Sequence, residues 1–198
     1  MRNQYSGVRV NKSLRVWLLL NAVAYIMGAV TGIGYFTIGG IMAPVSDFMA
    51  IIIGLTFIPV TLLVARIFSV VDLSVAEFSR FMGLMGHIIF ALSGLALVIS
   101  YFSSSWFPEA PSFGKQAFAA QLVGIFLEGI WLFLLARLSR QAGLKTRFMV
   151  YLILAGAGNV LFVAGTAMKM SAVAGGMAFV GFIAYILWAF GFRKSLKG

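Results

Sequence analysis

FMAIIIGLTFIPVTLLVARIF, residues 48–68, is the stretch of sequence that decides the fold. Its single charged side chain, Arg66, lies close to the end of the stretch. A helix needs about 20 predominantly apolar residues to cross the hydrocarbon core of a bilayer. The stretch therefore predicts a membrane-spanning helix.

Further apolar runs of similar length lie on both sides of this stretch. Together they predict six spans, at residues 16–38, 48–68, 81–102, 117–138, 148–168 and 172–192. None of the connections is long enough to form a soluble domain. We therefore expect an all-α, polytopic membrane protein, a six-transmembrane-helix bundle over residues 16–192. A basic N-terminal segment, residues 1–15, precedes the bundle, and a basic tail, residues 193–198, follows it.

The composition agrees with this expectation. Of the 198 residues, 62% are hydrophobic and 10% are charged, whereas soluble domains contain about 45–50% apolar and 25% charged residues. The formal net charge is +10, but the basic residues stand at the ends of apolar runs instead of forming one binding face. This distribution argues against a nucleic-acid partner and favours the lipid bilayer.

The basic residues also predict the orientation. If the N-terminus is cytoplasmic, cytoplasmic segments hold 13 of the 15 Lys and Arg residues, and the outer segments hold only Lys115 and Lys169. Short loops rich in Lys and Arg stay on the cytoplasmic side. We expect both termini to be cytoplasmic in the inner (plasma) membrane. The first apolar run exceeds the 7–15 residues of a signal-peptide core, so we interpret it as a signal anchor.

Glu128 is the most informative polar residue, because it lies about ten residues inside the fourth predicted span. A charged carboxylate at the centre of a membrane helix costs about 2.5–3.5 kcal/mol on insertion scales. Such a residue usually faces the bundle interior or a wet cavity. Glu128 is therefore either a proton or cation site, or a protonated side chain that hydrogen-bonds a neighbouring helix.

His87 lies in the third predicted span at a depth similar to that of Glu128. Because consecutive spans often pack side by side, a His87–Glu128 pair is geometrically possible. The alternative is a neutral His87 that bonds a backbone carbonyl or a water. Gln121 precedes Glu128 by seven residues, so both project from one face of the fourth helix.

Two further amides, Asn21 and Asn159, lie within the spans, as do several threonines. They either line a narrow polar path or make separate interhelical hydrogen bonds. Gly28 and Gly32 form a G-x-x-x-G pair in the first span, which lets helix backbones approach closely. That pair serves either internal packing or a dimer face.

Local signals predict the connections. Ser74 and Glu77 have the spacing of a capping box, which would start the third helix there. Pro44 and Asp47 are expected in the first outer loop, and residues 103–116 in the longest one.

The sequence argues against several kinds of chemistry. There is no Cys and only one His, which excludes disulfides, thiolate metal sites and two-His metal sites within one chain. Hydrolase, P-loop and Rossmann motifs are absent. We predict no metal site and no catalytic residue, and no cofactor is identified.

Three functions fit these observations. The first is a non-enzymatic subunit or accessory protein of a larger membrane assembly, with other membrane subunits or a second copy as partner. The second is a small oligomeric transporter or channel, coupled to protons or cations, that uses Glu128 with His87. The third is an intramembrane enzyme acting on a lipid or quinone. The lack of a catalytic motif favours a protein that is not an enzyme.

Overall fold

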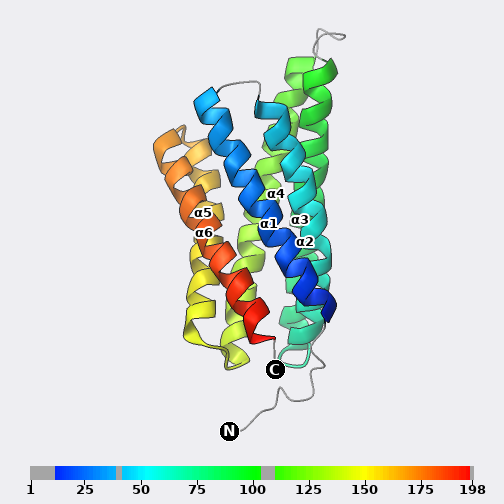
Figure 1. The fold of residues 1–198 in the computed structure, drawn as a ribbon, viewed down its shortest axis with the longest axis vertical. Coiled ribbons are helices and arrows are strands. Elements are labelled where there is room, and N and C mark those ends of the chain that lie inside the picture. The colour runs from blue at the N-terminus through cyan, green and yellow to red at the C-terminus, as the bar shows by residue number, and fades with distance from the viewer. Residues whose placement is uncertain (1–11, 39–41, 104–109, 197–198) are drawn as a thin grey trace.

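The computed structural model describes residues 12–38, 42–103 and 110–196, which form six helices and no strand (Figure 1). In chain order the helices are α1 (Lys12–Ile38), α2 (Ala43–Phe68), α3 (Leu73–Ser103), α4 (Ala110–Gln141), α5 (Thr146–Ala167) and α6 (Ser171–Ser195). Each helix is long and apolar enough to cross a membrane. The prediction of an all-helical chain with six such segments is confirmed, one helix for each predicted span.

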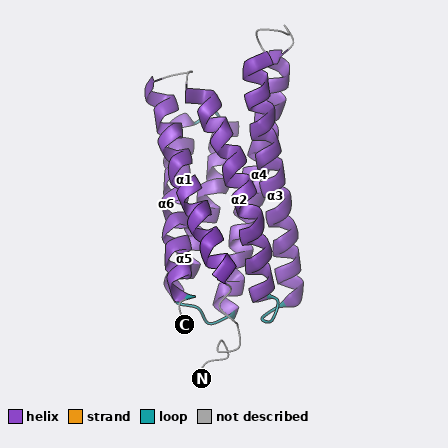
Figure 2. Cartoon of the chain, turned by 45° about the vertical axis from the view of Figure 1, so that its right-hand side comes forward, coloured by secondary structure: helices purple, strands orange, loops and turns teal. Residues whose placement is uncertain are grey.

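The helices form a closed ring. Each helix packs against its neighbours in the sequence, and α1 also packs against α6. Consecutive helices run in opposite directions, so α1 begins and α6 ends at the same end of the bundle (Figure 2). There the Arg193 Nε donates a hydrogen bond to the carbonyl oxygen of Arg15 at 3.1 Å.

We call this the basic end, because most of the described Lys and Arg residues lie on the helix segments and turns that meet there. They are Lys12, Arg15, Arg66, Arg80, Arg137, Arg140, Lys145, Arg147, Arg193 and Lys194. Lys115 and Lys169 lie toward the opposite end. Arg2, Arg9 and Lys197, which also entered the orientation argument, lie outside the described residues.

The outer surface of the ring is apolar. Large hydrophobic side chains are exposed on all six helices, among them Val30, Leu55, Leu92, Leu161 and Phe179. A soluble protein rarely exposes so extended an apolar surface, whereas lipid accepts it. The fold is therefore consistent with a multi-pass integral membrane protein.

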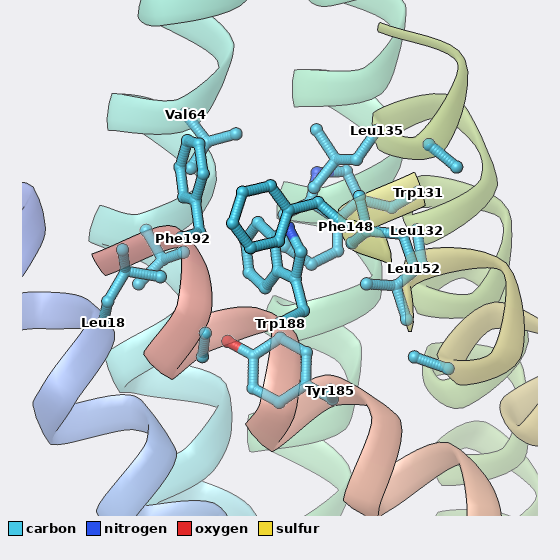
Figure 3. Close-up of a cluster of buried hydrophobic side chains, with 14 of the residues drawn as sticks. Leu18, Val64, Trp131, Leu132, Leu135, Phe148, Leu152, Tyr185, Trp188 and Phe192 are labelled. Carbon is cyan, nitrogen blue, oxygen red and sulfur yellow. The ribbon is translucent and has the colours of Figure 1, made fainter. Parts of the chain in front are cut away.

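The two halves of the ring are packed differently. The largest fully buried side chains all lie within about twelve residues of the basic end. They are Trp131, Trp188, Tyr185, Phe57, Phe68, Phe148, Leu14, Leu18, Leu132, Leu135, Leu138 and Leu152. Figure 3 shows Trp188 of α6 among residues of α4 and α5 in this region, and Phe192 stacks on Phe68 of α2 with ring centroids 6.4 Å apart. Toward the opposite end, the buried residues are mostly small, such as Ala50, Ala117 and Ala174.

Glycines set the closest helix crossings. A Cβ atom on Gly124 of α4 would lie 2.9 Å from the carbonyl oxygen of Gly86 on α3. A Cβ atom on Gly158 of α5 would lie 2.7 Å from the backbone nitrogen of Gly181 on α6. Small residues of this kind let membrane helices pack backbone to backbone. The first of these crossings brings the backbone of Glu128 beside α3.

The two glycines predicted as a packing pair behave differently. A Cβ atom on Gly28 would lie 2.7 Å from the Ile53 Cδ1 of α2, so Gly28 serves packing within the bundle. A Cβ atom on Gly32 would have no neighbour within 4 Å. Gly28 and Gly32 therefore do not act together at one helix contact within the bundle, although they share the G-x-x-x-G spacing.

Two predicted connections need correction. The first turn of α3 is capped by Asp72, whose Oδ1 accepts a hydrogen bond from the Val75 backbone nitrogen at 3.0 Å; Ser74 is not the cap, and Glu77 pairs with Arg80. Pro44 lies in the first turn of α2, where the missing amide hydrogen is tolerated. Because α3 extends to Ser103 and α4 begins at Ala110, the outer connection is shorter than predicted.

Helix α4 ends at the basic end and α5 at the opposite end, and both finish with the same hydrogen-bond pattern. After α4, the Leu144 nitrogen donates to the Ser139 oxygen and the Gly143 nitrogen to the Arg140 oxygen, both at 3.0 Å. After α5, Met170 and Lys169 donate in the same way to Gly165 and Thr166. This is the Schellman motif, whose left-handed position favours glycine. In the motif after α4, Gly143 occupies this position, with φ 66°. In the motif after α5, the residue at the same position is Lys169, with φ 58°.

Replacing Lys169 by glycine should therefore stabilise the protein by up to about 1 kcal/mol, because a non-glycine residue in the left-handed region carries a penalty of that order. The reciprocal variant Gly143→Ala should destabilise it by a similar amount. Nothing lies within 4 Å of a Cβ atom at Gly143, so only the backbone conformation is tested. Denaturant unfolding in mild detergent measures both changes, and a shift of the same sign in both variants would contradict the prediction.

Candidate functional site

Glu128 forms a buried hydrogen-bonded pair with Tyr25. The Glu128 side chain is only 2% exposed, and its Oε1 accepts a hydrogen bond from the Tyr25 hydroxyl of α1 at 2.5 Å. The only ion pair among the described residues joins Glu77 and Arg80 at the surface, so no cation neutralises Glu128. A carboxyl group in such surroundings is best accommodated in its protonated form.

A second polar network lies beside this pair. The Asn21 Nδ2 donates to the Thr56 Oγ1 at 2.9 Å and to the Ile53 carbonyl oxygen at 3.3 Å. The Asn21 Oδ1 accepts a hydrogen bond from the Tyr185 hydroxyl, which points toward α1 in Figure 3. Asn21 therefore connects α1 to both α2 and α6, and all of its side-chain atoms are satisfied within the bundle.

Aromatic rings surround Tyr25 and join the two networks. The Tyr25 ring centroid lies 4.7 Å from that of Tyr185, 5.3 Å from that of Phe57 and 5.8 Å from that of Phe182. Tyr25 and Phe182 are half-buried, whereas Tyr185 and Phe57 are buried. Glu128 and these four rings are called the Glu128 site below. It lies where the densely packed basic half of the ring meets the half that buries small residues.

His87 is fully buried but does not pair with Glu128. Its ring stacks on Phe57, with centroids 4.1 Å apart, and meets the edge of Trp131. Neither imidazole nitrogen has a hydrogen-bond partner among the described residues. The His87–Glu128 pair that the sequence left open is not formed, because the His87 ring turns toward α2 while Glu128 reaches Tyr25 on α1.

The remaining predicted polar residues lie apart from the site's hydrogen bonds. Gln121 is buried on α4, at 9% exposure. Asn159 is half-buried at the α4–α5 crossing, where a Cβ atom on Gly129 would lie 3.3 Å from its Cβ. Neither side chain makes a hydrogen bond to another part of the chain that the structure describes. Of the amides and threonines predicted to line a path, only Asn21 and Thr56 meet.

Sequence reasoning missed the two tyrosines that complete the site. Tyr25 and Tyr185 lie deep in their spans, away from the headgroup boundary where tyrosine is usually found. A buried tyrosine hydroxyl generally has a hydrogen-bond partner. The position of the tyrosines within the spans was therefore the available signal, and the amide and carboxyl groups of Asn21 and Glu128 were the available partners.

Comparison with known proteins gives no further assignment: no protein-family model, curated protein or solved structure matches this chain. Glu128 has a polar partner within hydrogen-bond reach, the minimum that proton transfer needs. The described residues contain no group of three His, Cys, Asp or Glu side chains that would hold a metal ion.

Proposed function

We propose that this protein is a small proton-linked transporter or channel in which Glu128 binds the proton. One observation carries the proposal: the chain's one carboxyl group at this depth is buried, has no cationic partner among the residues that the structure describes, and is hydrogen-bonded across the ring to Tyr25. Ionisable residues inside membrane segments are costly and characteristically mark proton or ion pathways.

The packing of the ring supports a direction of access. The large buried aromatic and leucine side chains fill the interior between the Glu128 site and the basic end. Toward the opposite end, the buried residues that the structure describes are mostly small, and the larger ones are Ile53, Leu97 and Gln121. We therefore infer that Glu128 exchanges its proton toward the opposite end, because the aromatic layer separates it from the basic end.

The distribution of Lys and Arg supports the orientation. Short segments rich in these residues remain on the cytoplasmic side of a membrane, so we place the basic end in the cytoplasm and both termini with it. We further propose that the membrane is the inner (plasma) membrane, so that the end opposite the basic end faces the outside.

Flux measurements on the reconstituted protein test this proposal. Vesicles that contain the protein and an internal pH-sensitive dye should discharge an imposed pH gradient faster than protein-free vesicles. Inorganic cations, organic cations and small anions are added one at a time on the outside, because the coupled ion is unidentified. A protein that leaves the gradient unchanged with every added ion is not a proton-linked transporter or channel.

An accessory subunit is the second candidate function. Its support is the open surface of α1 and α6 at Gly32, Gly175 and Gly176, where a Cβ atom would meet nothing within 4 Å. Small residues on a lipid-facing surface suit close contact with another membrane helix. Purification from the native membrane in mild detergent distinguishes the two candidates, because an accessory subunit should bring other membrane proteins with it.

A further inference from the structure

We propose that Arg15 and Arg193, where α1 meets α6 at the basic end, form a binding site for the phosphate of an anionic phospholipid. The inference goes beyond the proposed function, because it concerns the outer surface of the ring and does not depend on proton binding by Glu128. It follows from two arginines that meet at a helix seam without a carboxylate, and from the apolar surface that lies beside them.

The two arginines meet where the first and last helices close the ring. The Arg193 Nε donates a hydrogen bond to the Arg15 carbonyl oxygen at 3.1 Å, which brings the Arg193 guanidinium group to the backbone of α1. The Arg15 Nε has no hydrogen-bond partner among the residues that the structure describes. Both residues are half-buried, so each keeps part of its surface open. Two cations are therefore held at one seam, and part of the hydrogen-bonding capacity of Arg15 is unused.

No side-chain carboxylate is placed to neutralise this pair. Residues 1–46 and 129–198, which include all of α1 and α6, contain no Asp or Glu. The acidic residues at the basic end are engaged elsewhere: Asp72 caps α3, and Glu77 pairs with Arg80. Like charges held together in surroundings of reduced dielectric repel each other. An anion from outside the chain would therefore stabilise the seam.

The start of α1 adds to the attraction for an anion. The helix begins at Lys12, and its first turn contains no acidic residue. The amide groups at the start of a helix carry a partial positive charge that favours anions, but Lys12 and Arg15 occupy this turn instead. Lys194, which is exposed beside Arg193, adds a further cation at the same end of the seam.

The surroundings favour a lipid over a soluble anion. Large apolar side chains are exposed on both helices within about two turns of the arginines; they are Val16, Leu20, Leu187 and Phe190. Trp17, which follows Arg15 closely in α1, is half-buried, and tryptophan is enriched at the membrane–water interface. A headgroup bound at this depth would lay its acyl chains along the apolar surface of α1 and α6.

Arginine suits the phosphate of such a headgroup. The planar guanidinium group presents paired N–H donors that match two oxygens of a phosphate. Because the headgroup lies at the surface of the bundle, binding needs no internal cavity. One phosphate that bonds both arginines would link α1 to α6 and stabilise the closure of the ring.

Native mass spectrometry and thermal unfolding of the purified protein in mild non-ionic detergent test this site. Dioleoylphosphatidylglycerol, which is anionic, should bind and raise the unfolding temperature. Dioleoylphosphatidylcholine, which has the same acyl chains and no net charge, should bind more weakly and leave the temperature unchanged. Inorganic phosphate at the same concentration should neither raise the temperature nor displace the bound phosphatidylglycerol.

Variants locate the site on the basic end. Arg15→Gln and Arg193→Gln should each weaken phosphatidylglycerol binding about fivefold, because one cation near a membrane surface contributes about that factor. Arg140→Gln removes an exposed arginine of α4 at the same end and should leave binding unchanged. Arg193→Glu places a carboxylate beside Arg15, so its unfolding temperature should no longer respond to phosphatidylglycerol.

Three results would refute the proposal. Equal weakening by Arg15→Gln and Arg140→Gln would show that the whole basic end attracts the lipid without a site at the seam. Displacement of the lipid by inorganic phosphate would show a site for soluble anions, and equal binding of phosphatidylcholine would show contact with acyl chains alone. Glu128→Gln should bind phosphatidylglycerol like the wild type, so failure of this inference and failure of the proposed function are separate results.

Discussion

Replacement of Glu128 by glutamine is expected to abolish proton-linked flux and to leave the folded yield nearly unchanged. The amide oxygen of glutamine can still accept the Tyr25 hydroxyl hydrogen bond, and the side chain keeps its size. The amide cannot exchange a proton with water or with a substrate, however. Because a positioned acid or base contributes about 100-fold or more to a proton-transfer rate, flux should fall by at least that factor in reconstituted vesicles.

Two variants control this experiment. Glu77→Gln changes the same side chain at the surface of α3, outside the ring interior, and should retain wild-type flux. Tyr25→Phe leaves the Glu128 carboxyl group without its partner, which should destabilise the fold by about 1–3 kcal/mol. Undiminished flux in Glu128→Gln, with normal folding, would show that the carboxyl group is a structural hydrogen-bonding element.

Replacement of Gly158 by alanine should have the largest effect on stability. The added Cβ atom would lie 2.7 Å from the Gly181 nitrogen and 2.8 Å from the Met177 carbonyl oxygen, both of them backbone atoms of α6. A side chain can turn away from such a contact, but a helix backbone must move as a whole. Overpacking of this kind typically destabilises a protein by about 1–3 kcal/mol and sometimes by more.

Gly176→Ala provides the matched control on α6. A Cβ atom there would meet nothing within 4 Å, so the change in unfolding free energy should stay within about 1 kcal/mol. Thermal or denaturant unfolding in the same detergent compares the two variants with the wild type. Equal stability of Gly158→Ala and the wild type would mean that α5 and α6 do not cross at Gly158 and Gly181.

The predicted polar residues show which features of the site follow from the position of one residue in the sequence and which depend on its neighbours in space. Glu128 was predictable because its position in an apolar run is visible without any knowledge of its neighbours. Its partner was not: His87 lies at a similar depth on the adjacent helix, but the rotation of α3 about its own axis turns the ring onto Phe57. The depth of a residue within a membrane span can be counted along the sequence. The rotation of one helix against the next cannot, because it follows from packing.

The capping of α3 shows the same limit on a smaller scale. Ser74 and Glu77 have a spacing that suits a cap, but Asp72 also precedes the helix, and the structure uses it. Two local patterns competed within a few residues, and either one could satisfy amide groups at a helix start.

The sequence by itself determined that the chain folds as six apolar helices, because each run is long enough for a bilayer and carries its charges at its ends. Only the tertiary structure decided which side chains meet. The ring brings Tyr25 to Glu128 and Tyr185 to Asn21 across more than a hundred residues of sequence. The physical reason is that lipid selects segments by composition alone, whereas contacts within the ring depend on the crossing and rotation of helices that close-packed glycines permit.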